Sequence, residues 1–349
     1  MARIIFGVRR SCRRFYAESP RNQAAKRGRA STGQSILAVL LLFAASSVSA
    51  QSQQPAPPIR VTVNRVNVGV TVTDSAGHFV EGLRREDFRI FDNDVEQPIT
   101  DFLPVEEPAQ LLLLIESGPA VLFLSRTHLL AADMLLTKLA ATDRVAIASY
   151  SKMPQLVLDF TPNKTEARLG LQSINFSNDF ADLNLSSSLA TAIDWLAALP
   201  GKKAIVLLST GVDSSPPEDP QAIQRKLLTS DVRLLAVALA ADFRKPAKKH
   251  KKLSAQDRAN RDAVREGFAE ADQSLRELSA LTGGRVYFPS SADEFSRAYA
   301  EIAQLVRHEY SIAFAPPVAD GQLHSLKVKV KDPSYKVDHR QAYLGPANQ

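Results

Sequence analysis

Cysteine is almost absent from this chain of 349 residues. The single cysteine, Cys12, lies in the first 50 residues. The rest of the chain therefore cannot form disulfides, use a catalytic thiolate or bind a metal through cysteine.

The motifs of common enzyme classes are also missing. The sequence contains no Gly-x-Ser-x-Gly, no His-Glu-x-x-His and no glycine-rich phosphate-binding loop, and its six histidines are scattered. Ser117 and Ser209 are typical of loop residues, and the Gly-Gly pair at 283–284 is typical of a helix end. We therefore expect a protein that is not an enzyme; a hydrolase is the less favoured reading.

The chain has little net charge outside its N-terminal segment. Nine of its 43 Lys and Arg residues lie in residues 1–50, beside one of its 37 acidic residues. Residues 51–349 thus carry a net charge of −2, although the whole chain carries +6. Because the basicity belongs to the N-terminal segment, we expect no nucleic-acid partner.

The N-terminal segment resembles a secretory signal. An Arg-rich start precedes the apolar run 36–45, which is shorter than the roughly 20 residues of a membrane-spanning helix. The small residues at 48–50 then suggest cleavage after Ala50, and an exported protein that is periplasmic or extracellular. An uncleaved anchor is the second reading, and the two Arg pairs at 9–10 and 13–14 raise the twin-arginine route. A Pro- and Gln-rich linker follows at 51–58.

Both ends of the remaining chain have the alternating pattern of β-strands. In the N-terminal β segment, 59–108, Val66, Val68, Val70 and Val72 alternate with polar residues or glycine. The C-terminal β segment, 310–349, has a similar pattern. We therefore expect the two segments to form one β domain that flanks the middle of the chain.

The middle of the chain, 109–309, alternates between strands and helices. The unbroken apolar run 111–115 is typical of a strand that is buried on both faces. The pattern predicts a doubly wound, mostly parallel α/β sheet with helices on both faces. Strands are expected at 145–150, 155–160, 204–208, 234–239 and 285–288, with the first two as an antiparallel hairpin at one edge. Helices are expected at 165–174, 187–199, 220–229, 273–281 and 292–307.

A basic insertion at 243–265 interrupts this pattern. It has almost no apolar residues, so it is expected to be a loop that is partly disordered. Its cations suggest contact with an anionic surface of the cell envelope. The residues concerned are Arg244, Lys245, Lys248, Lys249, Lys251 and Lys252.

Several longer stretches resemble one known family. These are VTVTDSAGHFVEGLRREDFRIFDNDVEQPITDF, then LLLLI, LPGKKAIVLLSTGVD, HEYSIAFAPP and SLKVKVKDPSYKVDHRQAYLG, in that order. They are similar to the secreted bacterial proteins related to von Willebrand factor type A, over nearly all of residues 59–345. The resemblance implies a Rossmann-like type A domain at 109–309, framed by β segments, in an exported interaction protein.

Type A domains often bind Mg2+ at a metal-ion-dependent adhesion site, and the resemblance points to where its ligands would lie. The family pattern after the first strand is Asp-x-Ser-x-Ser. Here Glu116 takes the position of the Asp, whereas Gly118 and Ala120 replace the two Ser. An alignment shifted by one residue keeps only Ser117. A hard cation such as Mg2+ needs several oxygen ligands, and neither alignment supplies three here.

The later loops depart from the family pattern as well. Ser209 is followed by Thr210 where the family has an Asp, while Asp213 lies beyond the expected position. Ser186 offers an oxygen from the second loop. We therefore predict a degenerate adhesion site with no metal and no other cofactor. Its rim would bind a protein or a cell-envelope component through Glu116, Ser117, Gly118, Ser186, Ser209, Thr210 and Asp213.

A functional Mg2+-dependent adhesion domain is the alternative. In that case Glu116, Ser117 and Asp213 would hold the ion.

Overall fold

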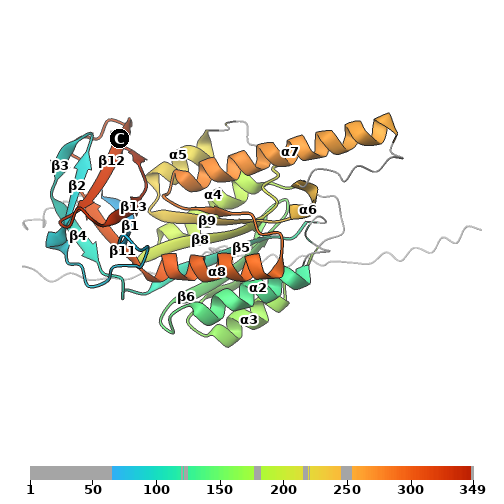
Figure 1. Ribbon diagram of the computed structural model, residues 1–349, viewed down its shortest axis with the longest axis horizontal. Coiled ribbons are helices and arrows are strands. Elements are labelled where there is room, and N and C mark those ends of the chain that lie inside the picture. The colour runs from blue at the N-terminus through green and yellow to red at the C-terminus, as the bar shows by residue number, and fades with distance from the viewer. Residues whose placement is uncertain are drawn as a thin grey trace, which may run out of the picture. The chain divides into compact units, whose positions relative to one another are not determined.

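The computed structural model describes residues 65–118, 121, 125–176, 182–214, 219, 221–244 and 254–346 (Figure 1). The predicted export signal with its cleavage after Ala50, the linker 51–58 and the start of the first β segment lie outside these residues. Of the six basic residues predicted to contact the envelope, only Arg244 is described. Within the described ranges, no helix is both long enough and apolar enough to cross a membrane.

A six-stranded sheet forms the middle of the chain, in the order β10-β9-β8-β5-β6-β7. All neighbouring pairs are parallel except β6 and β7, which form the predicted antiparallel hairpin at one edge. The strands are β5 (Ala109–Glu116), β6 (Arg144–Tyr150), β7 (Pro154–Thr161), β8 (Lys202–Ser209), β9 (Val232–Ala238) and β10 (Val286–Tyr287). The predicted α/β fold class is confirmed.

Helices cover both faces of this sheet (Figure 1). The helices α2 (Ser125–Lys138), α3 (Lys164–Gln172) and α8 (Ala292–Arg307) pack on one face, where Leu111 and Leu113 of β5 point. The other face, with Leu112 and Leu114, is covered by α4 (Leu185–Ala197), α5 (Ala222–Thr229) and α7 (Ala255–Ala280). The apolar run of β5 is unbroken because successive side chains enter two different cores.

The two ends of the chain build the expected β domain. Its sheets have the orders β13-β1-β11-β4 and β14-β12-β2-β3. The N-terminal strand β1 pairs antiparallel with the C-terminal β11, and Val68, Val70 and Ile312 are buried in a shared core. The strands are β1 (Val66–Thr73), β2 (Phe88–Asp92), β3 (Val95–Gln97), β4 (Ile99–Leu103), β11 (Glu309–Phe314), β12 (Leu323–Val330), β13 (Lys336–His339) and β14 (Ala342–Leu344), and a 3-10 turn covers Arg85–Asp87.

The prediction of a loop over 243–265 was wrong for its C-terminal part. Residues from Ala255 onward belong to the 26-residue helix α7, and a short helix α6 (Ala241–Arg244) precedes it. Ser254 caps α7 by accepting a hydrogen bond from the Asp257 backbone at 3.0 Å. The first turns of α7 are exposed to solvent, so they carry no apolar stripe from which the sequence would predict a helix.

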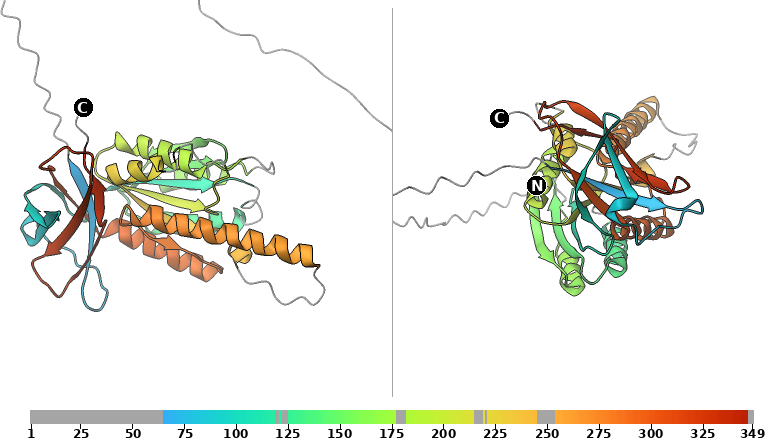
Figure 2. Two further views of the ribbon diagram at one scale, coloured as in Figure 1. Left: turned by 90° about the horizontal axis from the view of Figure 1, so that it is seen from above. Right: turned by 90° about the vertical axis from the view of Figure 1, so that its left-hand side faces the viewer.

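The β domain lies at the amino ends of the parallel strands (Figure 2). Buried charged side chains join the two. Arg233 of β9 forms an ion pair of 2.9 Å with Glu309 of β11, and both side chains are more than nine-tenths buried. Lys202, at the start of β8, donates to the carbonyl oxygens of Val105 and Glu309 at 2.8 and 3.2 Å. The opposite edge of the sheet, where β5 and β8 end, is left for the candidate site.

Candidate functional site

The predicted site residues come together at the carboxyl ends of β5 and β8. These strands are parallel neighbours, with Ile115 opposite Leu208, so the residues that follow them meet at the same edge of the sheet. Open α/β sheets bind ligands at this edge. Glu116, Ser209 and Thr210 are all buried. They therefore form a buried layer, the floor of the site, beneath the surface of this edge.

The carboxylate of Glu116 connects the two strand ends directly. Its Oε2 accepts hydrogen bonds from the Thr210 backbone at 2.7 Å, the Thr210 hydroxyl at 2.8 Å and the Ser209 hydroxyl at 3.1 Å. The side chain is 0% exposed. Burial raises the pKa of Glu116, against the opposing effect of the hydrogen bonds from Thr210 and Ser209. The acid thus links two loops, in an environment that favours its neutral form.

Tyr150, at the end of β6, extends this network to a third strand. Its hydroxyl lies 2.7 Å from the Ser209 hydroxyl and donates more weakly to Glu116 at 3.4 Å. The Ser117 backbone and hydroxyl both donate to the Tyr150 carbonyl oxygen, at 2.8 and 3.0 Å. The Ser117 hydroxyl is therefore engaged with the main chain.

Gly118 is buried because a leucine packs against it. A Cβ at this position would lie 3.0 Å from Leu183 Cδ2, a tighter contact than most side chains make. The small residue allows Leu183 to approach the end of β5. Ala120, at the position of the second Ser in the family pattern, lies outside the described residues.

Asp213 and Ser186 lie together above this floor, and both are half-buried. Oδ2 of Asp213 accepts a hydrogen bond of 2.9 Å from the Ser186 backbone in the first turn of α4. Asn184 caps the same helix by accepting from the Ser187 backbone at 3.0 Å. Oδ1 of Asp213 is buried without a hydrogen-bond partner among the described residues. One carboxylate oxygen of Asp213 is thus enclosed without a donor from the part of the chain that the structure describes.

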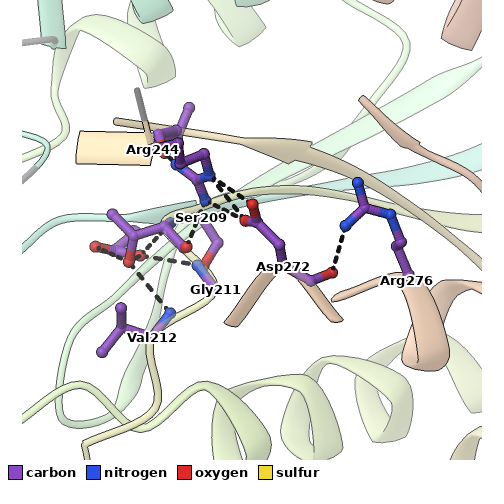
Figure 3. A network of polar contacts seen from close by, with 9 residues as sticks. Ser209, Gly211, Val212, Arg244, Asp272 and Arg276 are labelled. Carbon is purple, nitrogen blue, oxygen red and sulfur yellow. Dashed lines mark hydrogen bonds and ion pairs between the residues drawn. The ribbon is translucent and has the colours of Figure 1, made fainter. Parts of the chain in front are cut away.

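Arg244 fastens α7 to the loop that follows β8 (Figure 3). Its guanidinium donates to the Thr210 and Leu239 carbonyl oxygens, the former at 3.0 Å, and forms an ion pair of 2.7 Å with Asp272. The group also lies 4.9 Å from the centre of the Phe268 ring. Arg244 was predicted as part of an exposed basic surface, but its charge is used inside the protein because α7 supplies the carboxylate.

One histidine cluster was not foreseen from the sequence. His324 is buried in the β domain, where Nδ1 lies 2.7 Å from Asp92 and Nε2 lies 3.1 Å from Asp320. Although burial opposes it, hydrogen bonding to the two carboxylates raises the pKa of His324. Asp92 is 232 residues away in sequence, so no local spacing could indicate the pair. The described part of the chain contains no group of three or more His, Cys, Asp or Glu arranged to hold a metal.

Comparison with known proteins gives distant structural likenesses. No protein-family model matches the chain, and no curated protein matches its sequence. An aerotolerance-related membrane protein from Bacteroides fragilis is 14% identical, with 57% of this chain and 98% of that one covered and a TM-score of 0.43. A von Willebrand factor type A protein from Catenulispora acidiphila is 12% identical, with 74% of each chain covered and a TM-score of 0.43.

A third solved structure is that of proximal thread matrix protein 1 from the mussel byssus, with a zinc-occupied adhesion site. It is 12% identical, with 57% of this chain and 48% of that one covered and a TM-score of 0.41. At such values the fold of the present chain rests on its own strand order.

Proposed function

We propose that this chain is an exported binding protein whose contact surface is the carboxyl-end edge of the six-stranded sheet, and that it binds its partner without a metal ion. The observation that carries the proposal is the direct link from Glu116 to Thr210 and Ser209. In the type A domains that the sequence resembles, a divalent cation gathers oxygen ligands from the corresponding loops. Here hydrogen bonds join two of the loops.

The oxygen atoms needed by a metal are largely engaged in this network. Oε2 of Glu116 accepts several hydrogen bonds, and the hydroxyl of Ser117 donates to Tyr150. The contacts of Glu116 and Ser117 therefore support a degenerate adhesion site whose floor is already assembled.

The groups left for a partner are polar and lie around Asp213. Ser187 and Ser214 are exposed at this edge, and Ser186 and Asp213 are half-buried beside them. Oδ1 of Asp213 is itself buried, so the exposed groups of the rim are serine hydroxyls. This rim, defined as Ser186, Ser187, Asp213 and Ser214, suits a partner with polar hydrogen-bonding groups, such as a protein or another envelope component.

Catalysis is not part of the proposal. A general base needs a ring nitrogen or carboxylate within reach of a substrate proton. Both ring nitrogens of buried His324 already have carboxylate partners, and Glu116 is enclosed by hydrogen-bond donors. The hydroxyls that contact Glu116, those of Ser209 and Thr210, are themselves buried, so they are closed to a substrate.

Oδ1 of Asp213, buried with no donor among the described residues, is the observation that favours the alternative, a Mg2+-dependent adhesion domain. We expect millimolar Mg2+ or Mn2+ to leave the melting temperature of the purified chain unchanged, because the other ligands are engaged. A bound ion at 100 times its Kd would add about 2.7 kcal/mol to the free energy of unfolding, an effect that differential scanning calorimetry detects readily. A metal-dependent rise that disappears in Asp213→Asn would instead establish the adhesion site.

Cross-linking in intact cells tests export and the rim together. We expect the chain recovered from the envelope to begin at Gln51 by mass spectrometry, and to carry a cross-linked partner. Ser187→Arg should abolish the cross-link, because a long charged side chain then covers the rim, whereas Ser75→Arg, at an exposed turn of the β domain, should not. A chain that keeps residues 1–50 contradicts cleavage, and equal cross-linking by both variants contradicts the rim.

A further inference from the structure

A cavity of about 400 Å3 opens at the amino ends of the parallel strands. Glu116 lies at the other end of the strands. It lies between the β domain and the helices α4 and α5. Val66, Ile193 and Leu228 supply part of an apolar wall, and Arg340 and Lys226 supply cations. A volume of this size lies within the range of small-molecule sites.

The charges around this cavity do not balance. Four cations line it, and three of them have a carboxylate partner at ion-pair distance. The pairs are Lys203 with Asp231 at 2.8 Å, Lys226 with Asp194 at 2.6 Å, and Arg65 with Asp101 at 2.8 Å. The fourth cation, Arg340, has no ion pair among the residues that the structure describes.

Arg340 is also the most deeply buried of the four cations, with a relative exposure of 5%. Its Nη1 donates to the carbonyl oxygens of Ser230 and Leu228 at 2.7 and 3.4 Å, while its Nε is buried with no acceptor in the described part of the chain. Burial lowers the pKa of Arg340 to about 10. A buried charge without a counterion is unfavourable, so proteins normally pair such groups.

Capping of a helix accounts for only part of this arrangement. Nη1 of Arg340 reaches carbonyl oxygens at the C-terminal end of α5, where the helix dipole favours a cation. That contact neither supplies a full negative charge nor satisfies Nε. It also gives no reason for the cavity beside Arg340.

We propose that this cavity binds a small organic acid with one anionic oxygen group, whose negative charge pairs with Arg340. A guanidinium forms charge-assisted, directional hydrogen bonds with a carboxylate or a phosphate. The apolar part of the ligand packs against Ile193 and Leu228, and Lys226 lies on the same wall to add a second positive charge. The site is separate from the rim around Asp213, so either proposal stands if the other fails.

Titration of the purified whole chain tests the proposal with defined probes. Benzoate and phenyl phosphate should each bind saturably in isothermal titration calorimetry and raise the melting temperature, whereas neutral benzyl alcohol should not. The stronger of the two anions identifies the headgroup as a carboxylate or a phosphate. Absence of saturable binding by both anions would overturn the proposal and leave Arg340 as a helix cap.

Variants of the cavity then locate the site. Arg340→Gln should weaken binding of the favoured probe at least about tenfold, the effect of losing one charge-assisted hydrogen bond. Because this variant also alters the end of α5, Asp194→Asn provides a second readout: it frees Lys226 from its carboxylate and should tighten binding. Lys138→Met, on the exposed end of α2, is the matched control. Unchanged affinity in both Arg340→Gln and Asp194→Asn would place any binding elsewhere and refute the proposal.

Discussion

Replacement of Glu116 by alanine should lower the free energy of unfolding by about 3 kcal/mol, because it removes the acceptor shared by several buried donors. The backbone and the hydroxyl of Thr210 would lose their acceptor in a region without access to water. Glu116→Gln keeps one acceptor oxygen and a similar shape, so its loss should be much smaller. Urea unfolding of the three proteins measures this difference.

The same residue predicts how stability changes with pH. Burial raises the pKa of Glu116 in the folded state above its ordinary value of 4.5, so the folded state favours the protonated acid. The stability contributed by Glu116 is therefore complete below pH 4.5 and is lost as the pH rises through the raised pKa. Glu116→Gln should remove this loss.

An exposed acid at the same edge provides the control. Asp182→Asn should leave both the stability and its pH dependence unchanged, because the Asp182 side chain is in solvent. If Glu116→Ala were as stable as the parent protein, the carboxylate would not be what joins the two strand ends. The proposal that this site is held together by hydrogen bonds without a metal ion would then lose its main support.

Arg233→Met should lower the free energy of unfolding by about 3–5 kcal/mol, the usual effect of breaking a buried ion pair at one partner. Glu309 would remain enclosed, since both side chains are more than nine-tenths buried. The Glu309 carboxylate is also packed closely against Gly69, since a Cβ on Gly69 would lie 2.8 Å from it. Chemical denaturation gives the loss directly.

Two further variants separate the charge from the packing. Arg233→Met combined with Glu309→Leu should recover much of the lost stability, because neither charge is then buried alone. Arg285→Met removes a cation from two ion pairs that are about half exposed, and should lower the free energy of unfolding by about 1 kcal/mol or less. If Arg233→Met and Arg285→Met lowered the free energy of unfolding equally, burial would not be what makes the Arg233–Glu309 ion pair stabilising.

The contacts of Arg233 and those of Glu116 lie at opposite ends of the parallel strands and stabilise different parts of the protein. At the amino ends, Arg233, Lys202 and Glu309 fasten the sheet to the β domain. At the carboxyl ends, Glu116 and Arg244 hold together the loop after β8 and the helix α7. The proposed rim therefore rests on a buried polar network that is independent of the joint with the β domain.

The sequence by itself determined the elements whose residues alternate between core and solvent. Helix α8 begins and ends where its apolar spacing predicts, because one side faces the sheet and the other faces water. The run in β5 predicts a strand buried on both faces for the same reason. The first turns of α7 gave no such signal, since they are exposed on all sides.

Only the tertiary structure decided how the polar residues are used. The sequence placed Glu116 and Thr210 at the candidate site, but not the hydrogen bonds between them, which join residues 94 positions apart. It likewise gave Arg244 a charge without the Asp272 that neutralises it. Periodicity reports the local environment of each segment, whereas a buried charge is satisfied by whichever group the folded chain brings within about 3 Å. The fold could therefore be predicted from local pattern, and the chemistry of its edges could not.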